Sequence, residues 1–309
     1  MKLALLCNNH VAFPALQQLH AQGISLHVGA DAANTDLLPA LSQYCTAFNA
    51  PLQLFKKEAF EAELHPWLDE VKPHAVLMMT FPFRIPEQAL SKPKHGFLNF
   101  HYGLLPHYRG ANPVFEQLRR REKQGGITLH QVEKGIDTGA VILQKQIPIH
   151  PTETFGMHMN RLSMLGAEMI QSVVSLLSSA DPLPGVQQDN TKAVYYGKPG
   201  LNDVTINWSR MSAADIVALC NACYPWNYGA GMKLNGNTLG LSAAVILDNK
   251  PVSAGVKAGT IITTDPLNGL TVATADGKVL RLDMIYVDNS FMPGYQLALF
   301  GVMPGALLS

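Results

Sequence analysis

The first hundred residues alternate short apolar runs with segments of helical period, and this alternation constrains the fold more than any other feature of the chain. The apolar runs lie at residues 2–7, 25–29, 51–54 and 75–79. The segments between them place apolar side chains every three or four positions, the spacing of one helix face. Strands that alternate with helices of this length pair in parallel through crossover connections. We therefore predict an α/β domain with a doubly wound, mostly parallel sheet that holds ligands at the carboxyl ends of its strands.

The second half of the chain has a different pattern, which begins near residue 204. After one expected helix at 212–223, short alternating apolar segments predict a small β barrel or sandwich. Turn-forming pairs separate these segments: Asn235-Gly236, Asp248-Asn249, Asn268-Gly269 and Asp276-Gly277. The residues just before position 204 are rich in Pro, Gly, Asp and Asn, which is typical of a linker. The predicted organisation is an α/β domain at 1–180, a linker at 181–203 and a β domain at 204–309.

The chain of 309 residues carries 23 basic and 23 acidic side chains, so its formal net charge is zero. Residues 205–309 hold six of each sign, which leaves 17 of each for the rest of the chain. A protein that wraps DNA or another polyanion needs clustered Lys and Arg, so this balance argues against that class. The basic run at 119–123 ends an expected helix, where cations favour the dipole, and we interpret it as a solvated face.

The four cysteines are too few for a disulfide scaffold, which favours a reduced, cytoplasmic location. Cys220 and Cys223 form a C-x-x-C pair, but no second pair lies nearby, so we expect buried small residues and no metal site. No stretch approaches the roughly 18 consecutive apolar residues that a membrane span needs. We therefore expect no membrane partner.

Polar side chains are expected to gather where the strand at 96–100 ends. Asn99 and His101 lie two positions apart, so their side chains share one face of the extended backbone. An amide donor beside an imidazole can stabilise an oxyanion and handle a proton. Asp137 adds a carboxylate on the loop Gly135-Ile136-Asp137-Thr138-Gly139, between two expected strands. The flanking glycines would let the backbone approach a planar ligand closely.

The pattern N-F-H-x-G-L-L-P-x-x-R-G begins at Asn99, and the aspartate of G-I-D-T-G follows 36 residues after its histidine. Together these motifs resemble the folate-dependent formyltransferases, which use 10-formyltetrahydrofolate as co-substrate. Three motifs of the second half resemble the small OB-like barrel that methionyl-tRNA formyltransferases and some relatives carry: Ile206-Asn207-Trp208, Pro225-Trp226-Asn227-Tyr228-Gly229-Ala230 and Leu234-Asn235-Gly236. The resemblance covers most of the chain and implies a Rossmann-like catalytic domain followed by that barrel.

The resemblance also implies roles for individual residues. Asn99 and His101 would stabilise the oxyanion of the tetrahedral intermediate. Asp137 would work with the histidine and an ordered water to move a proton from the attacking amine toward the leaving folate nitrogen. Contacts to the folate would come from two loops, at Phe83, Arg84, Ile85, Val132, Glu133, Gly135 and Ile136. Candidate acceptor contacts are Tyr102, Gly103, which stands where the family usually has serine, and Arg109.

The acceptor is the least constrained part of this interpretation. Methionyl-tRNA formyltransferases carry a basic loop after their second strand, whereas residues 29–36 of this chain contain neither Lys nor Arg. We therefore favour the amine of a small or carrier-bound acceptor, such as an amino sugar or an amino-acid derivative, over methionyl-tRNA. Two other interpretations stay open. One is a hydrolase that releases formate, in which water attacks in place of the amine, and the other is a folate-binding protein without turnover.

Overall fold

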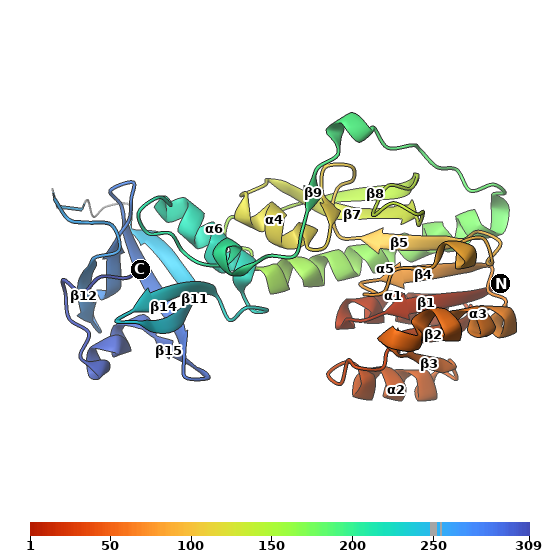
Figure 1. Cartoon of the computed structure of the whole chain (residues 1–309), viewed down its shortest axis with the longest axis horizontal. Coiled ribbons are helices and arrows are strands. Elements are labelled where there is room, and N and C mark those ends of the chain that lie inside the picture. The colour runs from red at the N-terminus through yellow and green to blue at the C-terminus, as the bar shows by residue number, and fades with distance from the viewer. Residues whose placement is uncertain (248–251, 254) are drawn as a thin grey trace. The chain divides into compact units, whose positions relative to one another are not determined.

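The computed structural model describes residues 1–247, 252–253 and 255–309, and the chain divides into two compact units (Figure 1). Unit 1 comprises Met1–Ala111, Gly125–Ile147 and Met159–Tyr196. Unit 2 comprises Asn112–Gln124, Pro148–His158 and Gly197–Ser309. The turn expected at Asp248-Asn249 lies outside the described residues.

Unit 1 is built on a seven-stranded sheet with the order β3-β2-β1-β4-β5-β7-β8. The first five of these strands pair in parallel, and β7 joins β5 antiparallel. This arrangement confirms the predicted doubly wound, mostly parallel sheet. The strands are β1 (Lys2–Cys7), β2 (Ser25–Asp31), β3 (Leu52–Phe55), β4 (Ala75–Met79), β5 (Phe97–His101), β7 (Gln124–Gln131) and β8 (Val141–Pro148).

The central strands are buried on both faces, which explains their continuous apolar sequences. Every residue of β4 is buried, and so are Leu3–Cys7 of β1. The helices of this unit are α1 (Phe13–Ala21), α2 (Leu38–Ala47), α3 (Phe60–Val71) and the part of α5 (Phe155–Ser179) that follows His158. Helix α2 ends at Ala47, and Asn49, two residues further on, adopts a left-handed backbone with φ 51°, a conformation common just after helices.

Strand order reverses between β1 and β4, because β2 and β3 lie on one side of this pair and β5 on the other. Open α/β sheets bind ligands beyond the carboxyl ends of their strands at such a switch point. Strand β5 reaches this edge at His101, and the segment that follows it contains the short strand β6 (Arg109–Gly110). The edge of the sheet is therefore where the predicted site residues begin.

The segment expected to be a linker is packed over much of its length. Strand β9 (Tyr195–Tyr196) pairs in parallel with β6, and Val186 forms a bridge with Val141. Residues 181–196 belong to unit 1 by their contacts. A composition rich in Pro, Gly, Asp and Asn is typical of linkers, but here its polar groups bond to the sheet domain. The domain boundaries drawn from the sequence stay a prediction.

Helix α5 is, among the described residues, long and apolar enough to cross a membrane by length and composition alone. Half of its most apolar window is buried inside the structure, and core helices of folded domains have the same properties. The expectation of no membrane partner stays a prediction.

Unit 2 contains a six-stranded antiparallel sheet with the order β10-β11-β14-β13-β12, and β15 pairs with β14. Its strands are β10 (Ala230–Leu234), β11 (Asn237–Leu247), β12 (Ile261–Asp265), β13 (Gly269–Ala273), β14 (Val279–Val287) and β15 (Ser290–Pro293). The β10–β11 turn is Asn235-Gly236, and both residues take positive φ, as a tight hairpin turn requires. Helices α4 (Pro113–Arg119) and α6 (Ala213–Cys223) belong to this unit as well.

The end of the chain closes this sheet toward a barrel. Leu308 forms a bridge with Leu234 of the edge strand β10, and Leu307 forms one with Thr260, which directly precedes β12. The last residues of the chain thus pair at both edges of the sheet and partly cover edges that would otherwise be open. The small β-barrel domain predicted from the sequence is confirmed.

Candidate active site

Strand β5 places Asn99 and His101 on one face of the sheet edge. Asn99 is half-buried, and His101 is buried. The Nε2 atom of His101 bonds to the backbone carbonyl of Tyr108. Because a carbonyl only accepts hydrogen bonds, Nε2 carries the proton of the neutral ring. Nδ1 is then the acceptor nitrogen of His101.

Asp137 meets His101 from the loop between β7 and β8. Its Oδ2 atom lies 3.6 Å from His101 Nδ1 and accepts a 2.8 Å hydrogen bond from the backbone N–H of Gly110. The backbone of Asp137 is left-handed, with φ 53°, which a residue other than glycine adopts only when its surroundings hold it there. The structure thus brings Asn99, His101 and Asp137 into one cluster; their catalytic roles stay predictions.

A fourth member of the cluster, His130 on β7, was missed from the sequence. Its Nε2 atom lies 3.2 Å from Asn99 Nδ2 and 3.4 Å from Asp137 Oδ1. Its Nδ1 atom donates to the carbonyl of Gln131 over 2.8 Å. The antiparallel register sets Asn99 directly opposite His130. Asn99 and His130 are 31 positions apart in the sequence, so no local pattern predicts that they pair. The only hint in the sequence was a histidine on the expected strand that leads into the loop of Asp137.

The pKa values of Asp137 and His101 are both lowered, so that a carboxylate faces a neutral imidazole. Burial opposes the charge of Asp137, but the neighbouring rings of His130 and His101 and the hydrogen bond from the Gly110 N–H lower its pKa from 3.8 to about 2. Burial lowers the pKa of His101 below its usual 6.5, against the opposing effect of Asp137. Near neutral pH, Asp137 is ionised and His101 is uncharged. A proton that reaches Nδ1 would be stabilised by the adjacent carboxylate.

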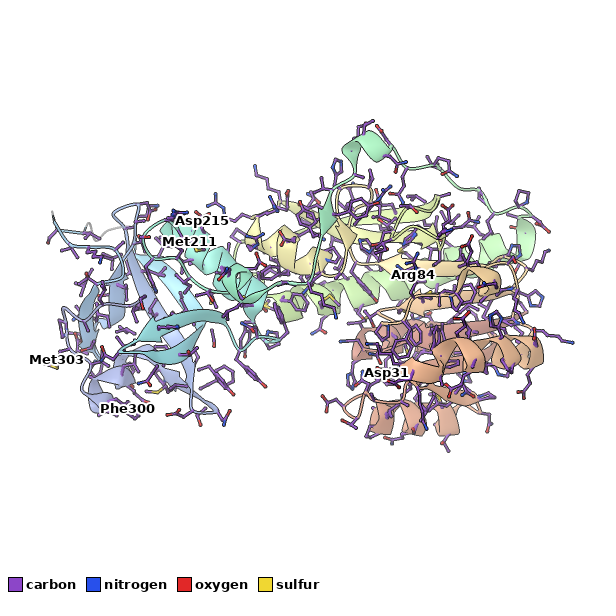
Figure 2. The ribbon with its side chains drawn as sticks, viewed as in Figure 1. Asp31, Arg84, Met211, Asp215, Phe300 and Met303 are labelled. Carbon is purple, nitrogen blue, oxygen red and sulfur yellow. The ribbon has the colours of Figure 1, made fainter. Side chains whose placement is uncertain are left out.

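The two loops expected to hold the folate adjoin each other. Arg84 Nη2 donates to the carbonyl of Lys134 over 2.6 Å, and both residues line a cavity of about 380 Å³, a volume within the usual range of ligand pockets. Figure 2 labels Arg84 among the side chains of unit 1. Phe83 and Val132 pack on the buried core cluster that contains Ile85. Glu133, Gly135 and Ile136 are exposed on the second loop, Ile136 by 62%.

The candidate acceptor contacts are enclosed by the protein. Tyr102 and Gly103 are buried, and the hydroxyl of Thr128 donates to the carbonyl of Gly103 over 2.6 Å. Arg109 is only 2% exposed, and its guanidinium bonds to three side chains of the 181–196 segment and β9: Gln188, Asn190 and Tyr195. The hypothesis that Arg109 contacts substrate is therefore not supported, because its donors are directed into the protein.

Gly139 serves a different purpose from the one expected. A Cβ atom at this position would lie 2.0 Å from the carbonyl oxygen of Gln131, so the residue must be glycine for the loop to return onto β7. The close approach is between two protein backbones. The glycine thereby shapes the loop that carries Asp137.

The cysteine pair on α6 is buried and unbridged. Burial raises the pKa of Cys223 to about 12, so the thiol stays protonated and is a poor metal ligand. Among the described residues, no group of three His, Cys, Asp or Glu side chains could hold a metal ion. The expectation of no metal stays a prediction.

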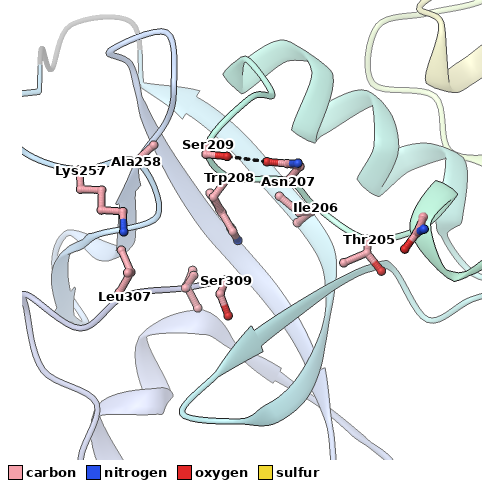
Figure 3. Close-up of a pocket in the computed structure, with 11 residues that line it drawn as sticks. Thr205, Ile206, Asn207, Trp208, Ser209, Lys257, Ala258, Leu307 and Ser309 are labelled. Carbon is pink, nitrogen blue, oxygen red and sulfur yellow. Dashed lines mark hydrogen bonds between the residues drawn. The ribbon is translucent and has the colours of Figure 1, made fainter.

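A cavity of about 420 Å³ lies in unit 2 (Figure 3). Its lining includes Trp208, Lys257 and Leu307, and Ser209 Oγ donates to Asn207 Oδ1 over 2.8 Å beside it. None of the predicted site residues lines this cavity. It is therefore separate from the cluster around Asp137.

Two family profiles match the chain. One, described as formyl transferase, matches residues 6–174, and the other, described as the C-terminal domain of formyl transferase, matches residues 201–296. The first match includes the whole cluster at the sheet edge, and the second includes most of the antiparallel sheet.

Curated relatives carry the name methionyl-tRNA formyltransferase. The protein from Nitrosomonas europaea is 32% identical over 212 residues, which are 69% of this chain and 64% of that protein, just under two thirds of its length. The protein from Nitrosomonas eutropha is 32% identical over 259 residues, covering 80% of this chain and 79% of that protein.

Among solved structures, WlaRD, a sugar 3N-formyl transferase crystallised with dTDP and 5-N-formyl-THF, is similar in fold. It aligns with a TM-score of 0.69 at 17% identity, over 91% of this chain and 96% of that one. At this identity the likeness concerns the fold alone. The sequence relatives and the structural neighbour thus bear names with two different acceptors.

Proposed function

The chain belongs to the formyl transferase family, and from this premise we propose that it moves a formyl group from 10-formyltetrahydrofolate to the amine of an acceptor. The observation that carries the proposal is the cluster at the end of β5, where an ionised Asp137 faces the acceptor nitrogen of a neutral His101. This arrangement fits a reaction in which an amine loses a proton while an oxyanion forms.

The proposed reaction forms one bond and breaks one. The amine nitrogen attacks the formyl carbon, and the carbonyl oxygen takes up the negative charge, which the Asn99 N–H that does not face His130 stabilises. His101 Nδ1 receives the proton that the attacking nitrogen loses, directly or through a water, and Asp137 stabilises the imidazolium. The proton then passes to the folate nitrogen as its bond to the formyl carbon breaks. The histidine ends neutral, and no oxidant or reductant is needed.

The adjoining loops of Arg84 and Lys134 support the proposed donor. 10-Formyltetrahydrofolate combines planar rings with a carboxylate-bearing tail. The cavity of about 380 Å³ is lined by the cations Arg84 and Lys134 and by the carboxylates Glu61 and Glu87, the latter 3.2 Å from Lys134 Nζ. Such a mixed lining can hydrogen-bond both the ring nitrogens and the tail of the donor, and Ile85 adds apolar surface. We assign this cavity to the folate because it lies along the same loop as Asp137.

For the acceptor we propose a small or carrier-bound amine. The turn after β2, at residues 32–37, carries no Lys or Arg. The basic run at the end of α4 is internally paired: Glu116 bonds to Arg119 and Arg120, and Arg121 lies 3.6 Å from Asp215. A polyanion would have to compete with these carboxylates, which weakens the case for a large nucleic-acid acceptor.

Methionyl-tRNA is the second candidate acceptor. It is favoured by the names of the curated relatives, of which one covers 80% of this chain at 32% identity. The match of residues 201–296 to the family's C-terminal domain is compatible with either acceptor.

A label-transfer assay separates these functions. The protein is incubated with 10-formyltetrahydrofolate carrying ¹⁴C in the formyl group, and with amino sugars, amino-acid derivatives, methionyl-tRNA or no amine. We expect label in a small amine. Label in methionyl-tRNA would overturn the choice of acceptor, and formate release at one rate with and without amines would identify a hydrolase. Folate binding without turnover of any kind would refute the proposal that the protein is an enzyme.

A further inference from the structure

A network of hydrogen bonds connects the buried Arg109 with the segment 181–196. Arg109 Nε and Nη2 donate to Gln188 Oε1 over 3.1 and 2.8 Å. Nη2 also donates to Asn190 Oδ1 over 2.8 Å, and Nη1 donates to Tyr195 Oη over 2.8 Å. A planar guanidinium with fixed donors is suited to hold several acceptors at once. The side-chain amide of Gln188 is thereby oriented with its nitrogen pointing away from Arg109.

That nitrogen holds the loop of Asp137. Gln188 Nε2 donates to the carbonyl oxygen of Asp137 over 2.8 Å and to that of Gly139 over 2.7 Å. One amide group thus fixes two backbone carbonyls, one of them belonging to the residue whose carboxylate faces His101. The left-handed backbone of Asp137 is unfavourable for a side-chain-bearing residue, so an external restraint of this kind is needed to keep it.

The same network reaches the carboxylate of Asp137 from a second side. Gly110 follows Arg109 on β6, and its N–H donates to Asp137 Oδ2 over 2.8 Å. Gly110 has φ 109°, and a Cβ atom there would lie 2.0 Å from the carbonyl oxygen of Tyr196 on β9. The pairing of β6 with β9 therefore places the donor that binds the carboxylate.

We propose that Gln188 and Arg109 are positioning residues for the formyl transfer assigned above, and that they act through Asp137. Gln188 holds the backbone of Asp137, and Arg109 orients Gln188 and supports the adjacent Gly110. This inference rests on the proposed function. It gives Arg109 a role different from the substrate contact expected from the sequence.

Gln188→Glu is the most discriminating variant. It keeps the shape of the side chain and the acceptors for Arg109, so the buried guanidinium stays paired, but it removes both N–H donors to the loop. We expect kcat to fall about 100-fold, the cost of misplacing a reacting group by roughly 1 Å. The KM for the acceptor amine should change less than about threefold, because the loss is confined to the transition state. Gln187→Glu is the matched control: it makes the same change at the exposed neighbouring residue, and kcat should stay unchanged.

A double variant tests whether the effect passes through Asp137. Single-turnover rates are measured for Asp137→Asn with and without Gln188→Glu. If Gln188 acts through the carboxylate, the second substitution should add less than about a twofold loss, because coupled residues are not additive. A further 100-fold loss, or an unchanged kcat in Gln188→Glu alone, would overturn the proposal.

Hydrogen exchange provides a readout that does not need turnover. In Gln188→Glu, the backbone of residues 135–140 and the N–H of Gly110 should exchange faster, whereas Gln187→Glu should match the wild type. Unchanged exchange in both variants would refute the positioning role even if the wild type transfers formyl groups. A wild type that transfers nothing to any amine, with faster exchange in Gln188→Glu, would refute the proposed function and leave the structural restraint in place.

Discussion

Charged side chains have different surroundings at the sheet edge of unit 1 and on the antiparallel sheet of unit 2. At the edge, Asp137 has a side chain only 12% exposed, and its partners come from residues 101, 110 and 130. On the antiparallel sheet, Arg281 pairs with Asp283 two residues away on the same strand, and their side chains are 41% and 34% exposed. A buried charge destabilises a fold unless its hydrogen-bond and ion-pair partners are in place, whereas an exposed ion pair changes the free energy of unfolding little. The difference supports the proposal that the reaction takes place at the sheet edge around Asp137.

Asp137→Asn should have the largest effect. The amide keeps the size of the side chain but cannot stabilise an imidazolium at His101, so kcat for formyl transfer should fall about 1,000-fold, within the usual range for losing a positioned proton-transfer group. Binding of 5-formyltetrahydrofolate, measured by fluorescence titration, should stay within about threefold, since the proposed folate contacts do not include the carboxylate of Asp137. Asp283→Asn makes the same change on the antiparallel sheet and should leave kcat at the wild-type value. A kcat of Asp137→Asn within tenfold of the wild type would remove Asp137 from the mechanism.

Gly110→Ala should have the next largest effect, on stability as well as rate. The added Cβ would lie 2.0 Å from the Tyr196 carbonyl oxygen and would need an unfavourable positive φ, so we expect a loss of about 3 kcal/mol in the free energy of unfolding. Gly277→Ala in unit 2 is the matched control: φ is 72°, but nothing lies within 4 Å of the new atom. That variant should lose about 1 kcal/mol, from backbone conformation alone. Equal losses in urea unfolding would show that close packing at β6 and β9 is not what requires the glycine.

The sequence allowed the parallel core to be predicted because its signal is local. Each strand of β1 to β5 is a short apolar run, and each helix shows its period within a dozen residues. The residues at which helices end are harder to predict. Helix α2 ends before Asn49, whose left-handed backbone no periodicity reveals. The pairing of β7 with β5 was also hidden, since antiparallel addition at a sheet edge leaves no trace in the strand's own sequence.

The candidate site shows the same limit. Asn99 and His101 share a face because of their spacing, so a local rule found them. His130 reaches the cluster only through the register between β5 and β7, and Arg109 finds its partners 79 to 86 positions along the chain. An arginine in a glycine-containing loop suggests a ligand contact when nothing indicates what will cover it. The segment that covers it had the composition of a linker.

Acidification should lower the free energy of unfolding of the wild type by about 2 kcal/mol more than that of Asp137→Asn. The pKa of Asp137 is about 2 in the folded protein and 3.8 for an ordinary aspartate, so the unfolded chain takes up the proton first as the pH falls. The stabilisation by the ionised carboxylate is complete above about pH 5 and is lost as the pH falls toward 2, by about 2 kcal/mol in total. Unfolding by urea between pH 5 and 2.5 should show this extra loss in the wild type relative to Asp137→Asn. Burial also lowers the pKa of His101, but its contribution begins near pH 6.5 and has the same sign. Parallel pH profiles for the two proteins would contradict the environment assigned to Asp137.

Asp283→Asn should have the smallest effect and is the stricter test of the contrast between the two regions. The substitution keeps the side-chain volume and removes one charge from an exposed pair that Arg281 forms through Nε and Nη2. Solvent already screens this pair, so the free energy of unfolding should fall by about 0.5 kcal/mol, and by less in 1 M salt. Urea unfolding at low and high salt measures both values. A loss above 2 kcal/mol that salt does not reduce would mean that the antiparallel sheet depends on specific charge pairing, as the edge of the other sheet does. The contrast drawn between the sheet edge around Asp137 and the antiparallel sheet would then fail.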